Sequence, residues 1–173
     1  MNITLIGMAG VGKSVIGKAL ARRLDYRFID TDDLIEQEWN LELQEIIDRF
    51  GEQRFLEIEE ETILKLGPLD RSVISPGGSV IYSEKAMTFL KGNSVVVFLD
   101  APFESIEKRI PDRSTRGIIG LKGKDLRALF QERLSLYKKY AEETVEIPDD
   151  FDTHAVVEEI IHKVSQLCEN LSL

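Results

Sequence analysis

The sequence predicts an α/β fold, with three αβα layers and a five-stranded parallel sheet between the helices. Short apolar runs alternate with amphipathic segments along the chain. The fourth run, 94–99, is apolar almost throughout, as expected of a strand covered on both faces. A glycine-rich loop, 7–14, joins the first run to the first helical segment. We expect strands near 2–6, 26–29, 72–75, 94–99 and 144–147, and helices at 13–24, 31–38, 42–66, 83–91, 102–109, 123–141 and 153–170.

Composition excludes several classes of protein. A length of 173 residues with 43% hydrophobic residues fits one domain, 1–173, with a substantial core. The net charge of −9 argues against general binding of nucleic acid. No apolar run approaches the ~20 residues that a membrane span needs. The first strand begins at once, without a signal peptide, and Cys168 has no second cysteine to pair with. We therefore expect a cytoplasmic protein, by default a monomer.

The glycine-rich loop carries the nucleotide prediction. Residues 7–14, GMAGVGKS, match the phosphate-binding pattern G-x-x-x-x-G-K-[ST]. Its glycines let backbone N–H groups approach a phosphate, and the next helix adds its N-terminal partial charge. Lys13 can reach the β- and γ-phosphates of ATP, and the Ser14 hydroxyl can hold Mg²⁺. An ordinary turn would not explain these two residues. We expect nucleotide contacts from Gly10, Val11, Gly12, Lys13, Ser14 and Val15.

Three carboxylates follow the second predicted strand, in the stretch Phe28-Ile29-Asp30-Thr31-Asp32-Asp33. Strand ends of a parallel sheet are where ligands gather. Asp30 could orient Mg²⁺ or the attacking hydroxyl, while Asp32 could bind substrate hydroxyls and act as a base. The alternative is that Thr31 or Asp32 merely caps the next helix. Asp33 is the weaker candidate, and Asp100, after the fourth strand, is either another magnesium ligand or a helix cap.

The segment 31–66 is predicted to be a helical insertion. It would bind the acceptor, the molecule whose hydroxyl receives the phosphoryl group, and Gly51 would separate two helices in 42–66. Small P-loop kinases place their acceptor-binding segment between the second and third strands. We interpret the acidic stretch 57–61 as a solvated helix face rather than a metal cluster. After the third strand, Gly77 and Gly78 would allow close backbone approach to a ligand. The alternative is a tight turn into a helix capped by Ser83.

A lid is predicted at 110–122, which holds two arginines and small residues without strong periodicity. Closure would exclude water and could bring an arginine to the transferring phosphoryl group. Arg116 is the candidate and Arg113 the reserve. The alternative is an exposed loop with incidental charge. Taken alone, Arg133 on the following helix would be an ordinary surface arginine.

Together these residues resemble the shikimate kinase family of small P-loop kinases over nearly the whole chain. The resemblance rests on the loop at 7–14, Asp30-Thr31-Asp32, Gly51-Glu52-x-x-Phe55, Gly77-Gly78, Arg116 and Arg133-x-x-Leu136-Tyr137.

The resemblance implies transfer of the ATP γ-phosphate, with Mg²⁺, to the 3-hydroxyl of shikimate. Asp30 would serve Mg²⁺ and Asp32 the acceptor hydroxyls. Gly77 and Gly78 would approach the acceptor by their backbone, and Arg133 would bind its carboxylate. Arg109 would lie against adenine and Arg116 would face the phosphates.

Three positions depart from the family pattern. The family has Gly-Glu-x-x-Phe-Arg, and Leu56 stands at the arginine that clamps the carboxylate of shikimate. Leucine cannot make that bidentate contact, and Arg54, two positions away on a helix, faces elsewhere. Ser79 stands where the family has a third glycine. The lid sequence Arg-Pro-Leu-Leu is Arg-Gly-Ile-Ile here, at 116–119.

Three functions remain open from the sequence. The first is a shikimate kinase with a weakened or rebuilt carboxylate clamp. The second is a kinase of the same architecture for another hydroxylated metabolite, which Leu56 and Ser79 favour. The third is a nucleotide-binding regulatory protein that transfers no phosphate. The intact loop residues Lys13 and Ser14, with Asp30 and Arg116, argue against the third.

Overall fold

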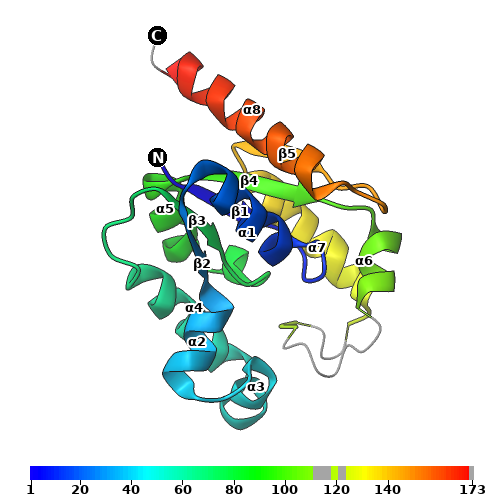
Figure 1. The fold of residues 1–173 in the computed structure, drawn as a ribbon. Coiled ribbons are helices and arrows are strands. Elements are labelled where there is room, and N and C mark those ends of the chain that lie inside the picture. Colours follow the sequence, from blue (N-terminus) through cyan, green and yellow to red (C-terminus); the bar gives the residue numbers. More distant parts are fainter. Residues whose placement is uncertain (111–117, 121–123, 172–173) are drawn as a thin grey trace.

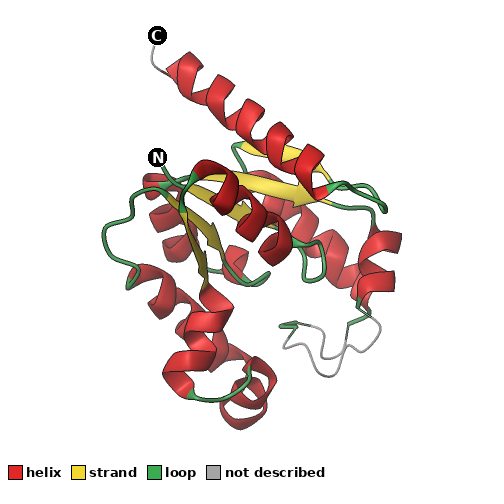
Figure 2. Cartoon of the chain, in the orientation of Figure 1, coloured by secondary structure: helices red, strands yellow, loops and turns green. Residues whose placement is uncertain are grey.

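The computed structural model describes residues 1–110, 118–120 and 124–171. Its five strands form one parallel sheet in the order β2-β3-β1-β4-β5, which confirms the predicted fold class (Figures 1 and 2). The strands are β1 (Ile3–Ile6), β2 (Arg27–Asp30), β3 (Ser72–Ser75), β4 (Val95–Asp100) and β5 (Glu143–Glu146). The helices are α1 (Lys13–Leu24), α2 (Thr31–Trp39), α3 (Leu43–Phe50), α4 (Glu52–Leu64), the short 3₁₀ turn η1 (Val80–Tyr82), α5 (Glu84–Asn93), α6 (Phe103–Arg109), α7 (Leu126–Tyr140) and α8 (Thr153–Leu171).

The first strand, β1, is the centre of the sheet. Ile3 pairs with Val73 of β3 on one side and with Val95 of β4 on the other. Every residue of β1 is buried, because helices cover both faces of a parallel sheet. The phosphate loop therefore leaves the middle of the sheet, where the order of the strands reverses. Such a switch point is where open α/β folds bind their ligands.

Helices cover the two faces of the sheet. On one face α1 packs against β1 and β3 and also contacts α8 (Figure 1). On the other face α5 and α7 pack against β4, and α6 adjoins α7. The longest helix, α8, has 19 residues, but no helix in the described part of the chain is long and apolar enough to span a membrane.

The predicted helical insertion extends from the carboxyl end of the sheet as α2, α3 and α4 (Figure 1). Gly51 separates α3 from α4, as predicted, with φ of 84° and ψ of 162°. Glycine adopts this backbone conformation without the steric cost that a Cβ would add. Four buried apolar residues of the insertion form a separate cluster with Ile119 of the segment before α7; they are Ile35, Ile46, Phe55 and Ile58.

Helix capping differs in part from the prediction. The cap of α2 is Asp30, whose Oδ1 accepts the N–H of Asp32 at 3.1 Å, so the expectation of Thr31 or Asp32 as cap was wrong. Asp100 does not cap α6, which begins after Pro102 without a side-chain cap. Ser83 caps α5 as expected, because its hydroxyl accepts the N–H of Ala86.

Candidate active site

Three strand ends form the wall of a groove of about 410 Å³ around the phosphate loop. The loop follows β1, Asp30 ends β2, and Ser75 and Pro76 follow β3. Gly10 and Gly12 have φ of 80° and 107°, in the region that favours glycine. The side chain of Val15, in the first turn of α1, is exposed. The loop thus presents its backbone and the start of a helix to the groove, as an anion site requires.

Lys13 lies across the base of the loop. Its Nζ donates hydrogen bonds to the carbonyls of Gly7 at 2.9 Å and Met8 at 3.2 Å. Burial lowers the pKa of Lys13 to about 8, although the nearby carboxylates of Asp32 and Asp30 oppose this change. The ammonium group is therefore held beside the loop, where it can meet the anionic phosphates of a nucleotide.

Ser14 and Asp30 supply oxygen atoms that suit Mg²⁺. The Ser14 hydroxyl donates to Asp30 Oδ2 at 2.8 Å, and both residues line the loop groove. Hydroxyl and carboxylate oxygens are ordinary ligands of Mg²⁺, which commonly takes only one or two protein ligands beside phosphates and water. Asp100, the other candidate ligand, lines a different groove, with Thr144 and Lys163.

A second cavity, of about 60 Å³, adjoins the groove on the side of the helical insertion. Ala9, Lys13 and Asp32 line both spaces, so the two are neighbours across these residues. This cavity contains the predicted substrate-binding positions in the described part of the chain. Its lining consists of Ala9, Lys13, Asp32, Leu43, Phe55, Glu59, Gly77, Gly78, Ser79, Ile118, Ile119 and Arg133.

Asp32 borders both spaces. Among the described residues, no hydrogen-bond donor reaches its buried Oδ1 atom. Burial raises the pKa of Asp32 to about 6, and the charge of Asp30 adds to this increase while Lys13 opposes it. A buried carboxylate oxygen without a partner is costly, and a ligand hydroxyl would satisfy it.

Arg133 projects into the cavity from α7 and is 1% exposed. Taken alone it would have been expected at the surface, whereas the resemblance implied a position in the site. Its Nη2 donates to the carbonyl of Ile119 at 2.7 Å. Its buried Nε has no acceptor among the described residues. A Cβ on Gly78 would lie 3.0 Å from Arg133 Nη1, so a glycine at this position leaves room for the guanidinium.

Glu59 is a cavity residue that the sequence argument missed. The expected solvated acidic face is correct for its neighbours, but Glu59 is only 4% exposed. Ser79 Oγ donates a short hydrogen bond to Glu59 Oε2. Burial raises the pKa of Glu59 to about 8, although this hydrogen bond opposes the change. The signal was the spacing of Phe55, Glu59 and Thr62, which places the acid on the buried face of a helix.

The glycine after β3 fits closely between two acids. A Cβ on Gly77 would lie 2.3 Å from Glu59 Oε1 and 2.9 Å from Asp32 Oδ1. Any side chain here would displace one or both carboxyl groups. The backbone of 77–78 thus approaches the cavity as the glycine pair predicted, and Tyr137 fixes it by donating to the carbonyl of Gly78 at 2.6 Å.

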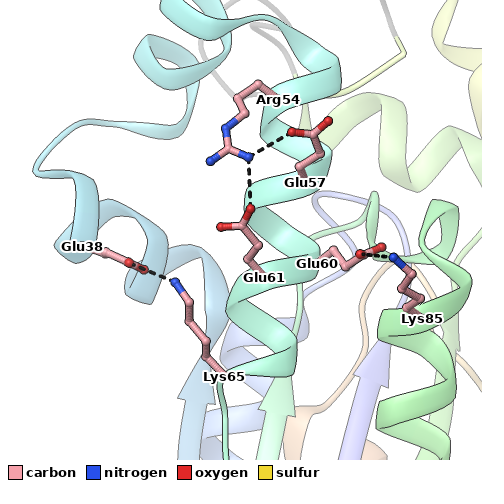
Figure 3. Close-up of polar contacts among 7 residues, drawn as sticks. All are labelled: Glu38, Arg54, Glu57, Glu60, Glu61, Lys65 and Lys85. Carbon is pink, nitrogen blue, oxygen red and sulfur yellow. Dashed lines mark hydrogen bonds and ion pairs between the residues drawn. The ribbon is translucent and has the colours of Figure 1, made fainter.

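No arginine of α4 takes the place of the family arginine at position 56. Leu56 packs against the apolar cluster of the insertion and does not line the cavity. Arg54 donates to Glu57 at 2.9 Å and to Glu61 at 3.0 Å on the outer side of the helix (Figure 3). Arg133 is therefore the one guanidinium among the described residues that line this cavity.

The predicted lid, 110–122, is described only at Ile110 and 118–120. The candidate phosphate ligand Arg116 and its reserve Arg113 lie outside the described residues. The end of the segment contacts the insertion, because the N–H of Gly120 donates to Glu52 Oε1 at 3.3 Å. Ile119 packs into the apolar cluster of the insertion.

Arg109, the predicted adenine contact, lies at the end of α6 beside the loop. Its Nη2 donates to the carbonyl of Asp149 at 2.8 Å, and its guanidinium lies 5.3 Å from the centre of the Phe151 ring. A Cβ on Gly10 would lie 3.5 Å from the Arg109 side chain. Arg109 is therefore next to the phosphate loop.

Comparison with known proteins agrees with this architecture. The family model of shikimate kinase matches residues 9–165. The shikimate kinase of Thermodesulfovibrio yellowstonii is 35% identical over 99% of this chain and 96% of its own length. That of Rippkaea orientalis is 36% identical over 95% of this chain and 88% of its own length.

Two solved structures have the same fold. The shikimate kinase of Acinetobacter baumannii in complex with shikimate superimposes with a TM-score of 0.87, at 28% identity, covering 95% of this chain and 93% of that one. The Aquifex aeolicus shikimate kinase gives 0.81 at 30% identity, covering 97% and 98%. The chain therefore belongs to the shikimate kinase family, whose members are phosphotransferases acting on a hydroxyl group.

Proposed function

We propose that this single-domain protein transfers the γ-phosphoryl group of ATP, with Mg²⁺, to the 3-hydroxyl of shikimate. One observation carries the proposal. Two buried polar atoms of opposite character, Asp32 Oδ1 and Arg133 Nε, lack partners among the described residues and belong to side chains that line one cavity beside the phosphate loop. An acceptor with both a hydroxyl and a carboxylate would satisfy both. Shikimate, bound in the similar Acinetobacter baumannii structure, is such a molecule.

The residues of the loop groove and those of the smaller cavity would then have separate roles, in binding the nucleotide and the acceptor respectively. Loop amides and Lys13 would hold the phosphates, and Ser14 and Asp30 would hold Mg²⁺, which neutralises phosphate charge when bound. Asp32, at the border of the two spaces, would orient the acceptor hydroxyl toward the γ-phosphate and accept its proton. Arg116 is our candidate for a further phosphate contact and Arg109 for the contact with adenine.

A second candidate function is a kinase for another hydroxylated metabolite. The observation that favours it is Leu56, which packs into the apolar cluster and leaves Arg133 as the one guanidinium among the described cavity residues. A clamp of two arginines would select a carboxylate more strongly than one does. An acceptor that lacks a carboxylate would lose less in this site than in one with both arginines.

Coupled ADP release with Mg·ATP tests the proposal. We expect turnover on the order of 10 s⁻¹ with shikimate and background without an acceptor. Lys13→Ala should abolish this turnover, whereas Lys18→Ala, an exposed lysine further along α1, should retain it. Turnover with a sugar or polyol but not with shikimate would favour the second candidate. Binding of ATP without turnover on any acceptor would contradict both and support a regulatory protein.

A further inference from the structure

Tyr82, in the 3₁₀ turn η1, lies against the guanidinium of Arg133 but does not line the acceptor cavity. The central guanidinium carbon of Arg133, Cζ, is over the Tyr82 ring, 5.4 Å from its centroid. An aromatic face attracts a cation through its quadrupole, and more strongly where water is excluded. Arg133 is buried, so little water weakens this attraction. The ring is therefore one of the groups that hold a buried positive charge in place.

The hydroxyl of Tyr82 fixes the position of the ring. It donates to Glu132 Oε1 at 2.6 Å, and Lys124 forms an ion pair with Oε2 of the same carboxylate. Glu132 directly precedes Arg133 on α7, so Tyr82 contacts two consecutive residues of that helix. A change in χ1 that swung the ring away from Arg133 would break the hydrogen bond to Glu132.

The segment after β3 approaches the guanidinium of Arg133 at two points. Tyr82 contributes its ring, and Gly78 leaves room for Nη1, because a Cβ at Gly78 would lie 3.0 Å from that atom. A third contact is the hydrogen bond from Nη2 to the carbonyl of Ile119 at 2.7 Å. The buried Nε has no acceptor in the described part of the chain. These contacts restrain the guanidinium and leave its Nε–H group unused.

A ring suits this position better than an acid would, if the guanidinium is to bind an anion. A carboxylate partner would neutralise the charge and occupy N–H donors that an anionic acceptor needs. A ring face orients the cation without supplying a carboxylate. An arginine side chain also has several rotatable bonds, so restraint before the acceptor arrives reduces the entropy lost on binding.

We propose that Tyr82 is a positioning residue for acceptor binding, whose ring holds the Arg133 guanidinium with its Nε–H open to the acceptor's carboxylate. Tyr82 acts through Arg133, since it is not part of the cavity lining. Arg133 is the one guanidinium among the described cavity residues, so its orientation would determine how well a carboxylate binds. The inference deepens the proposed function and rests on it for the identity of the acceptor.

Steady-state kinetics of the full chain with shikimate and Mg·ATP test this role. Tyr82→Leu removes the aromatic face, and we expect KM for shikimate to rise by roughly 2- to 30-fold, the range for a cation–π contact. The value of kcat and KM for ATP should change less. Tyr82→Met, which is also apolar and lacks a ring, carries the same expectation. Tyr82→Phe keeps the ring and should retain most of the affinity.

Tyr26→Leu is the matched control. The Tyr26 ring has Arg71 over it, with Cζ 5.7 Å from the centroid, and Tyr26 directly precedes β2 at the amino end of the sheet, away from the site. Loss of this ring should leave KM for shikimate unchanged. Measurement of Tm for each variant shows how much stability each ring contributes.

The rise in KM for Tyr82→Leu should be smaller with the methyl ester of shikimate, because the ester offers no carboxylate to Arg133. An equal rise for acid and ester would show that Tyr82 only supports the shape of the cavity, and would overturn the inference. So would a KM for shikimate that is the same in Tyr82→Leu, Tyr82→Met and the unmodified chain.

Proton–nitrogen NMR without any acceptor tests the contact itself. The ring current of Tyr82 should shift the signal of the Arg133 Nε–H, which Arg133→Lys identifies because it lacks that group. We expect the shifted signal in the unmodified chain and in Tyr82→Phe, and its movement in Tyr82→Leu. A signal at the same position in all three proteins would contradict the inference. If the contact is present but the unmodified chain does not turn over shikimate, the proposed acceptor is wrong, and so is the positioning role built on it.

Discussion

Arg133 has a buried guanidinium whose Nη2 donates to the carbonyl of Ile119, and no described residue accepts a hydrogen bond from its Nε. If this fork binds the acceptor's carboxylate, lysine cannot replace it, because an ammonium group has no bidentate geometry. We expect Arg133→Lys to lower kcat/KM for shikimate by roughly 30- to 5000-fold, the range for loss of a buried charged contact. Steady-state kinetics at saturating Mg·ATP measure this.

Two controls accompany this variant. Arg127→Lys changes an exposed arginine of the same helix and should leave kcat/KM within about twofold, as surface substitutions usually do. The penalty of Arg133→Lys should also be smaller with the methyl ester of shikimate. A penalty equal for acid and ester would show that Arg133 positions the cavity and does not bind the carboxylate.

Glu59 should also make stability depend on pH. Its pKa is about 8 in the fold against an ordinary value of 4.5, so the unfolded chain loses this proton first as pH rises. The free energy of unfolding should therefore decrease between about pH 4.5 and pH 8, on the order of a few kcal/mol from this group. Urea unfolding of Glu59→Gln across that range should lack this component. An identical pH dependence in both proteins would contradict the raised pKa.

The sequence predicted the site positions of motif residues better than those of residues whose burial depends on distant parts of the chain. Lys13 and Ser14 follow from a motif whose geometry is local, so the sequence contains all of it. Glu59 lies in an acidic run that looks like a solvated face, and its burial depends on a loop twenty residues later, at Ser79. Arg133 looks like a surface residue until α7 is packed against the glycine pair. The helical spacing of Phe55, Glu59 and Thr62 does indicate that Glu59 is buried, but the sequence alone does not show that Ser79 is its partner.

At the scale of elements, the junction between α3 and α4 depends on Gly51. Its φ of 84° and ψ of 162° lie in a region that is essentially restricted to glycine, and a Cβ there would meet no atom within 4 Å. Gly51→Ala should therefore cost backbone strain alone, about 1–3 kcal/mol of unfolding free energy. Because this junction sets the direction of α4, we also expect KM for the acceptor to rise more than KM for ATP.

Gly92→Ala is the matched control for this substitution. Gly92 lies within α5, and a Cβ there also meets no atom within 4 Å. Alanine is favoured over glycine in a helix, so this variant should be neutral or stabilised by up to about 1 kcal/mol. Thermal unfolding of both proteins, with kinetics for both substrates, makes the comparison. Equal effects of the two substitutions would show that the conformation of Gly51 is not the cause.

The elements were predictable where their pattern is local. Apolar runs bounded by turns gave all five strands within about two residues, and Gly51 correctly divided the insertion. The cap of α2 was misplaced because Asp30, Thr31 and Asp32 are all good capping residues. Only the backbone angles of Asp30, extended at the end of β2, decide among them. Helix-capping propensity alone cannot decide which of several adjacent residues with similar propensity is the cap.

At the scale of the whole molecule, the order of the strands explains why the groove around the phosphate loop and the smaller cavity adjoin each other. β1 lies between β3 and β4, so the phosphate loop leaves the sheet at its switch point. The ends of β2 and β3 add Asp30, Asp32 and Gly77 on one side of the loop. The alternation of strands and helices predicted this general arrangement. It could not predict the packing of the insertion against the sheet, which determines the shape of the acceptor cavity.

Nucleotide binding should stabilise the whole chain through Lys13. A ligand at 100 times its Kd adds about 2.7 kcal/mol to the folded state, which for a chain of this size raises Tm by roughly 5–10 °C. We expect this shift with Mg·ATP in the unmodified chain and in Lys18→Ala. Lys13→Ala should lose most of it at the same concentrations, because the charge beside the loop carbonyls is gone.

Each variant is compared with its own Tm without nucleotide, so any change that Lys13→Ala makes to basal stability cancels. Inorganic sulfate at matched ionic strength distinguishes specific binding from a general anion effect. The shift of Lys13→Ala should then equal its small shift in sulfate. A full shift in Lys13→Ala would mean that loop amides and the start of α1 hold the nucleotide without the lysine. Lys13 would in that case act only on the transferring group, and its loss would appear in kcat alone.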